Sequence, residues 1–180
     1  MLTRLRFSVA LVLFSGCSHI SHSGNGVSAD PWEYPVKLGA SRAQVHEVLG
    51  SASRSNQQLE EYPPSGVTVW FDSSDRVTKV GLEGEAGAVY VNASWDAPMP
   101  SDHPLAFGLT GHSAEADFRR TLGTPKREIQ ERAAAARELH LMWKKDGYVV
   151  DGLFLGLERD ERGRTYPVGS LLWFEVYRAL

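Results

Sequence analysis

The sequence partly repeats itself at a spacing of 73 residues, and this repeat constrains the fold more than any other feature. When residues 36–77 are aligned with residues 109–150, seven of the 42 pairs are identical. Chance gives roughly two or three matches at average composition. The identical pairs are Ala43/Ala116, Leu49/Leu122, Gly50/Gly123, Arg54/Arg127, Gln57/Gln130, Trp70/Trp143 and Val77/Val150. We infer a duplicated unit of about 73 residues.

Each unit is predicted to begin with a short helix. In the first unit Ser41 and Gln44 have the spacing of a capping box, apolar residues then recur at helical intervals, and Gly50 ends the helix. In the second unit Ser113 is the predicted cap and Gly123 the predicted end. The apolar stripe of each helix predicts packing against a sheet.

Alternating apolar and polar residues predict that strands fill the rest of each unit. Asp146-Gly147 indicates a tight hairpin, because both central residues of such a turn need positive φ. Residues 53–61 are polar and are interpreted as a loop or frayed helix, whereas residues 128–138 have good helix propensity and are predicted to be helical. The predicted strands are residues 67–71, 77–82 and 88–95 in the first unit and 139–144, 148–157 and 171–177 in the second.

This order of elements predicts an α+β fold of two tandem helix-then-antiparallel-sheet repeats, with the helices on one face of the sheet. The first repeat is expected over residues 32–96 and the second over residues 107–180. Residues 97–106 hold three prolines and are interpreted as the linker between them.

The start of the chain has the pattern of a secretory signal. Residues 1–16 contain two arginines, an apolar run of eight residues and then small residues. The stretch ending at Cys17 resembles a bacterial lipobox, although Phe14 stands where leucine is usual. The resemblance implies cleavage before Cys17 and its lipidation. Because Ser18 follows the cysteine, it also implies a periplasmic lipoprotein of the bacterial cell envelope, held at the outer membrane. Residues 17–31 are polar and rich in serine, which predicts a flexible tether.

The charge balance limits the kinds of partner that the chain is expected to bind. Residues 1–16 hold two arginines and no acids, so without them 17 basic residues face 22 acidic ones, a net charge of −5. An acidic chain does not attract nucleic acid, and we expect no such partner. Membrane contact is expected through the acyl anchor at Cys17. A single cysteine also excludes an intrachain disulfide.

We find no sequence motif for catalysis, metal binding or cofactor binding. Asp102, His103 and His112 are close enough in sequence to suggest an acid–base pair, but a linker beside a helix cap explains them more simply. We therefore expect no catalytic residue, no metal and no cofactor, and a hydrolase is the least favoured function class.

Alternation along the predicted strands places several aromatic residues on the sheet face away from the helices. Rigid aromatic side chains provide contact area at little entropic cost and often dominate protein interfaces. The predicted protein-binding residues are Trp70, Tyr90, Trp173, Glu175 and Tyr177. The alternative is that these aromatic side chains form a second core or pack beneath loops.

Short motifs carry a resemblance to a known family. Residues 39–41 (Gly-Ala-Ser), Leu49-Gly50, Phe71-Asp72 and Leu122-Gly123 resemble the BamE-type and β-lactamase-inhibitor-protein-type repeat. The chain differs from the inhibitor proteins in having no cysteine within either unit, and from BamE in being doubled. The resemblance implies a non-enzymatic protein that binds a protein partner, as an enzyme inhibitor or toxin-immunity protein. The alternative is an accessory lipoprotein in outer-membrane or envelope assembly.

Overall fold

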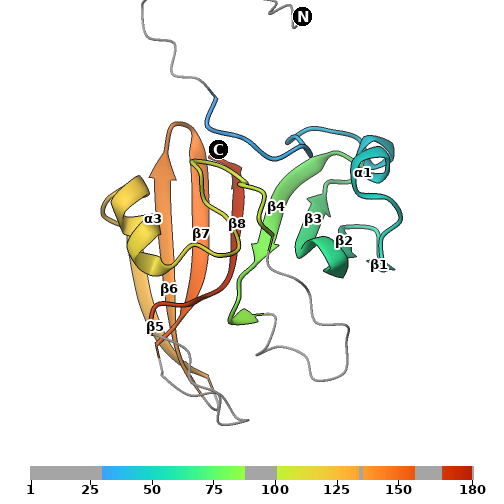
Figure 1. Cartoon of the computed structure of the whole chain (residues 1–180). Helices are drawn as coiled ribbons and strands as arrows, with labels where there is room; N and C mark the ends of the chain where they lie inside the picture. Colours follow the sequence, from blue (N-terminus) through green and yellow to red (C-terminus); the bar gives the residue numbers. More distant parts are fainter. Residues whose placement is uncertain (1–29, 88–100, 134–135, 157–167, 180) are drawn as a thin grey trace, which may run out of the picture.

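A single antiparallel sheet of eight strands dominates the computed structural model, which describes residues 30–87, 101–133, 136–156 and 168–179 (Figure 1). The strands lie in the order β1-β2-β3-β4-β8-β7-β6-β5. They are β1 (Arg54–Ser55), β2 (Leu59–Tyr62), β3 (Val67–Phe71), β4 (Val77–Glu83), β5 (Arg127–Ala133), β6 (Ala136–Lys145), β7 (Tyr148–Leu155) and β8 (Leu171–Arg178). Two short helices, α1 (Arg42–Leu49) and α3 (Glu115–Leu122), and a 3-10 turn, η1 (Pro63–Ser65), complete the described elements. None of these helices is long and apolar enough to cross a bilayer.

The predicted α+β fold of two tandem helix-then-antiparallel-sheet repeats is wrong. All eight strands form one continuous sheet, and only two short helices accompany it. The matching tryptophans are also not equivalent. Trp143 is 1% exposed and lies in the core, whereas Trp70 points to the opposite face of the sheet from Val69. Identity at a spacing of 73 residues therefore does not correspond to two equivalent structural units.

Local signals at the helix ends are largely confirmed. The Ser41 side chain accepts a hydrogen bond from the amide of Gln44, whose side chain accepts from the amide of Ser41, and α1 ends at Gly50 with φ of 78°. Helix α3 begins one residue later than predicted, because Asp117 accepts from the amide of Ala114. The hydroxyl of Ser113 accepts from Thr110 instead.

The two ambiguous segments are strands. Of residues 128–138, predicted as a helix, the described residues 128–133 and 136–138 belong to β5 and β6, and residues 53–61 contain β1 and most of β2. In the first segment the hydrogen bonds of the sheet outweigh the helix propensity, since β5 pairs with β6 over seven residue pairs. The hairpin at Asp146-Gly147 is confirmed, with φ of 49° and 81°.

Several predicted features lie wholly or partly outside the described residues. The predicted strand at residues 88–95, which includes Tyr90, lies outside the described residues, as does Cys17. Of the predicted linker, residues 101–106 are described, and its last two residues, Leu105 and Ala106, are fully buried. Ala106 pairs with Trp32 through an isolated β-bridge.

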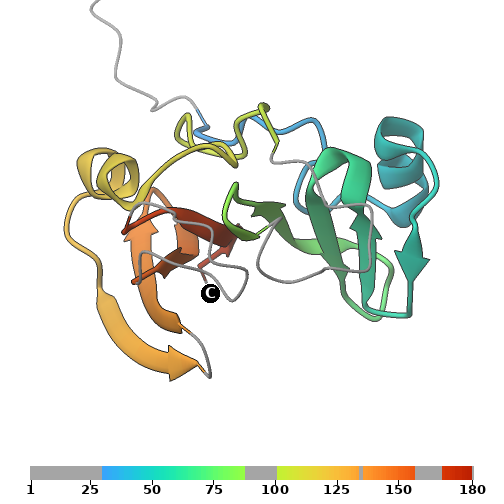
Figure 2. The same cartoon turned by 60° about the horizontal axis from the view of Figure 1, so that its bottom comes forward.

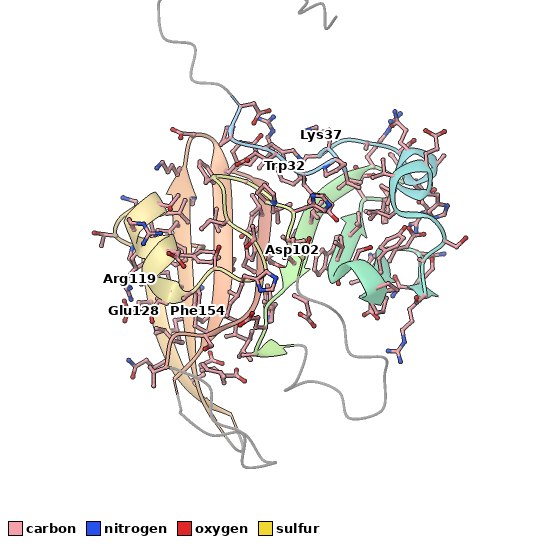
Figure 3. All side chains as sticks on the ribbon, in the orientation of Figure 1. Trp32, Lys37, Asp102, Arg119, Glu128 and Phe154 are labelled. Atoms are coloured by element: carbon pink, nitrogen blue, oxygen red, sulfur yellow. The ribbon has the colours of Figure 1, made fainter. Side chains whose placement is uncertain are left out.

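The core lies on the sheet face that both helices cover (Figure 2). Phe118 of α3 is fully buried, and its ring centroid lies 5.6 Å from that of Trp143 and 5.1 Å from those of Phe154 and Phe174. Between the two helices this face is covered by the segment that contains Trp32, while Phe154 lies beside α3 (Figure 3). The main core is thus one cluster along this face, and Ala86, Leu155 and Leu172 form a second, smaller cluster of buried residues.

The pairing of β4 with β8 joins the first four strands to the last four. Beyond the end of β4 the amides of Gly84 and Ala86 donate to the carbonyls of Leu172 and Leu171, at 2.8 and 3.1 Å. The backbones approach so closely that a Cβ on Gly84 would lie 2.6 Å from the carbonyl carbon of Leu171. A side chain larger than hydrogen does not fit there without displacing β8.

We expect Gly84→Ala to lower the free energy of unfolding by about 1–3 kcal/mol, because the added methyl group must push β8 away from β4. Chemical denaturation of the full chain measures the loss. Thr78→Ala, at an exposed position of the same strand, is the control and should change stability by less than about 0.5 kcal/mol. A Gly84→Ala protein with unaltered stability would show that this contact is not restrictive.

Candidate protein-binding face

The sheet face opposite α1 and α3, here called the outer face, brings together residues that are far apart in sequence. Strand pairing places Trp70 opposite Lys79 and Lys79 opposite Tyr177. In the next row Gly81 lies opposite Glu175, and in the one after that Glu83 lies opposite Trp173. Directly paired residues have neighbouring side chains, so these residues form one surface.

An ion pair lies at the centre of this surface. Lys79 Nζ is 2.8 Å from the Glu175 carboxylate, 4.2 Å from the Trp70 ring centroid and 6.0 Å from that of Tyr177. Burial raises the pKa of Glu175, although the hydrogen bond from Lys79 acts in the opposite direction. The side chains of Lys79 and Glu175 are 27% and 10% exposed, so solvent screens this pair less than an ordinary surface ion pair. The pair holds Lys79 between two aromatic rings.

The structure thus brings together four of the five predicted protein-binding residues: Trp70, Trp173, Glu175 and Tyr177. Their three aromatic side chains are half-buried, in contrast to the fully buried rings around Phe118. Trp173 also packs against a small cluster of Ala86, Leu155 and Leu172. One side of each aromatic ring therefore packs against the protein, and part of the ring remains exposed.

A pocket lies beside Gly81 on this surface. Gly81 lies between Thr68 on β3 and Glu175 on β8, and it contributes no side chain of its own. The Trp70 ring lies over this position, since a Cβ on Gly81 would be 3.0 Å from it, and a cavity of about 200 Å³ lies beside the ring. The residues that line this Gly81 pocket are Leu59, Glu61, Thr68, Trp70, Gly81, Leu82, Glu83, Trp173, Phe174 and Glu175.

Among the acidic residues that line the Gly81 pocket, Glu83 is the one whose charge no nearby basic side chain of the described chain balances. Burial, together with the nearby carboxylate of Glu61, raises the pKa of Glu83 to about 7. Glu61 lies 4.0 Å from Arg54, and Glu175 is paired with Lys79. In the part of the chain that the structure describes, no basic side chain lies within ion-pair distance of Glu83.

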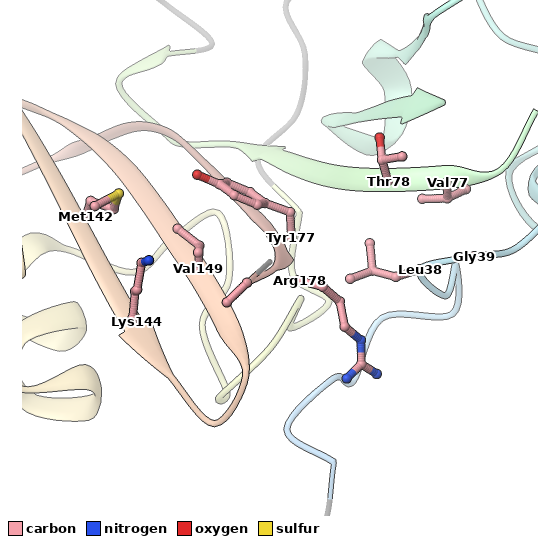
Figure 4. Close-up of a pocket in the computed structure, with 10 residues that line it drawn as sticks. Leu38, Gly39, Val77, Thr78, Met142, Lys144, Val149, Tyr177 and Arg178 are labelled. Carbon is pink, nitrogen blue, oxygen red and sulfur yellow. The ribbon is translucent and has the colours of Figure 1, made fainter. Parts of the chain in front are cut away.

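A larger groove lies at the other end of the outer face (Figure 4). It has a volume of about 740 Å³ and runs from Leu38 and Thr78 past the Tyr177 ring to Met142 and Lys144. Its surface is mainly apolar, with basic side chains at its margins. The outer face is therefore basic and apolar around Tyr177 and acidic around Gly81.

Other polar groups of the outer face were not predicted from the sequence. His140 Nε2 lies 2.6 Å from Asp151 Oδ1, and the His140 ring is 6.4 Å from that of Trp173. Alternation along β4 was sufficient to place Lys79, Gly81 and Glu83 on one face, but nothing in the sequence indicated that β8 lies beside them.

Asp102 and His112, considered above as an acid–base pair, do come together on the protein surface. His112 Nε2 lies 2.9 Å from Asp102 Oδ1, and His112 Nδ1 lies 2.8 Å from Glu85 Oε1. All three side chains are well exposed, as expected of surface ion pairs. Among the described residues no group of three or more His, Cys, Asp or Glu side chains is arranged to hold a metal ion.

Comparison of the chain with protein-family models, curated proteins and solved structures finds no match.

The Glu83 carboxylate is expected to destabilise the fold once it is ionised. Its pKa rises from an ordinary 4.5 to about 7, so between these pH values the folded protein holds more protons than the unfolded chain. The free energy of unfolding then falls as pH rises through this window. Since the side chain keeps some exposure, we expect Glu83→Gln to stabilise the protein by about 1–2 kcal/mol above pH 7 and very little at pH 4.

Denaturation of the wild type and Glu83→Gln at both pH values measures this difference. Glu47→Gln, which neutralises an exposed acid on α1, is the matched control and should behave alike at the two pH values. Equal stability of Glu83→Gln and wild type above pH 7 would contradict the assigned environment of Glu83.

Proposed function

We propose that this protein is a lipid-anchored bacterial envelope protein that binds a protein partner through its outer face, without catalysis. In this proposal it acts as an enzyme inhibitor or toxin-immunity protein. The supporting observation is the half-buried group of Trp70, Trp173 and Tyr177 around the Lys79–Glu175 ion pair. Because the predicted tandem repeat is wrong, the proposal depends on this surface and not on a duplicated unit.

The outer face has the properties that favour tight protein contacts. Aromatic side chains already packed on one side lose little freedom when a partner covers the other side. Lys79 is held by Glu175 and by the Trp70 ring, so its charge is in place before the partner arrives. A surface arranged in advance in this way lowers the entropic penalty of association.

Replacement of Trp173 by alanine is expected to weaken partner binding by about 2 kcal/mol or more, roughly 30-fold, because a central tryptophan is a frequent hot spot. The partner is first captured in the producing bacterium by a photoreactive phenylalanine analogue placed at Tyr177, on the same face of β8 as Trp173. The affinity of the purified partner for wild type and Trp173→Ala is then measured by calorimetry.

Val48 on α1 supplies the matched control. It is an exposed apolar residue, 48% accessible, on the opposite side of the molecule. The photoreactive group at Val48 should capture the partner poorly, and Val48→Ala should bind it like the wild type. Capture from Val48 as efficient as from Tyr177, or full affinity of Trp173→Ala, would refute the assignment of the outer face.

The identity of the captured partner separates the two proposed roles. A secreted enzyme or toxin whose activity falls on binding supports the inhibitor or immunity role. A component of the outer-membrane assembly machinery supports the accessory role instead.

Membrane attachment is proposed to depend on Cys17. We expect Cys17→Ser to abolish incorporation of labelled palmitate and to move the protein from the membrane fraction to the soluble periplasm, because the acyl chains supply the anchor. Metabolic labelling and cell fractionation measure both effects. Ser18→Ala, which retains the cysteine, is the control. Membrane attachment of Cys17→Ser equal to that of the wild type would contradict acyl anchoring.

A further inference from the structure

The Gly81 pocket combines aromatic and acidic lining residues. Trp70 and Trp173 supply indole rings, and Glu61 and Glu83 supply carboxylates. Because Gly81 has no Cβ, the Trp70 ring can lie close to β4, within 3.0 Å of the position that a Cβ would take. The pocket is therefore a hollow beside an indole ring and not only a cluster of acids.

The size of the pocket indicates what it can hold. Pockets for drug-sized small molecules have volumes of about 300–1,000 Å³. At about 200 Å³ the Gly81 pocket is smaller than these, and it suits one protein side chain. On a surface that docks a protein, such a pocket receives an anchor residue of the partner.

The charges around the pocket favour a cation. Lys79 already neutralises Glu175, and Arg54 lies 4.0 Å from Glu61 at the edge of the sheet. Glu83 is left without a basic neighbour in the described chain. Lys79 Nζ already lies 4.2 Å from the Trp70 ring centroid, so among the described residues it is the Trp173 ring that is left to stack on an incoming cation.

Building on the function proposed above, we propose that the Gly81 pocket binds an arginine side chain of the protein partner. The planar guanidinium group stacks on an indole ring and donates hydrogen bonds to two carboxylates at once, and the pocket offers both kinds of group. A lysine ammonium group is a point charge that lacks the planar face. The partner is thus expected to present an exposed arginine at the centre of its contact surface.

The arginine pocket is tested with the full chain, labelled with ¹⁵N in its tryptophan indoles, and with Nα-acetyl-arginine amide as the probe. The indole signals of Trp70 and Trp173 should shift and saturate. Those of Trp32 and Trp143 should not, because these residues are buried on the other face and donate to backbone carbonyls. The isosteric, neutral citrulline amide should bind at least about tenfold more weakly, since charge-assisted hydrogen bonds are lost.

Variants identify the carboxylate that binds the probe. Glu83→Gln is expected to weaken arginine amide binding about tenfold, whereas Glu47→Gln on α1 should leave it unchanged. Lowering the pH below about 7 should weaken binding in the wild type, as Glu83 gains a proton, and have less effect in Glu83→Gln. The groups that face Glu83 are Glu61 from β2 and Trp173 and Glu175 from β8.

The arginine assignment would be overturned by equal binding of citrulline amide, by tighter binding of the lysine amide, or by full binding to Glu83→Gln. These outcomes are distinguishable from failure of the proposed function. If the probe does not bind but Trp173→Ala still loses the captured partner, docking on the outer face stands and the arginine pocket fails. If the probe binds but Trp173→Ala keeps the partner, the docking proposal fails alone.

Discussion

The pairing of β4 with β8 is the contact on which the rest of the architecture depends. It joins the strands that precede α3 to those that follow it, and without it each half of the sheet would expose an unpaired edge. The close approach at Gly84 extends this junction beyond the last paired residues of β4. The same pairing brings Lys79 within 2.8 Å of Glu175, although the two residues are 96 positions apart in the sequence. The junction that completes the sheet thus also builds the proposed binding surface.

In our proposal the two faces of the sheet have different roles, with the core face stabilising the fold and the outer face binding the partner. On the core face the rings around Phe118 and Phe154 are fully buried. On the outer face Trp70 and Trp173 occur among Lys79, Glu175 and Glu83, and they keep part of their surface exposed. An antiparallel sheet permits this division because successive side chains point to opposite faces. Changes on the outer face can therefore alter binding while the core remains intact.

Features fixed by neighbouring residues could be predicted from the sequence, and features fixed by distant contacts could not. The capping box at Ser41 and the hairpin at Asp146-Gly147 are local, and the structure confirms both. Residues 128–138 were misassigned because their helix propensity is overridden by pairing with neighbouring strands. The prediction from the repeat was wrong for a different reason. Trp143 is in phase with the buried Leu141, whereas Trp70 alternates with the buried Val69, so the identical tryptophans face opposite sides of the sheet.

The proposed pocket follows from what the outer face lacks. Gly81 contributes no side chain between Thr68 and Glu175, and Glu83 has no cation beside it in the described chain. The uncompensated carboxylate does not benefit the isolated protein, because a neutral residue at this position would be more stable. In our proposal, a partner that inserts a cationic side chain fills the pocket and supplies the missing charge together. A residue that lowers the stability of the free protein and is compensated by a partner is what a recognition site requires.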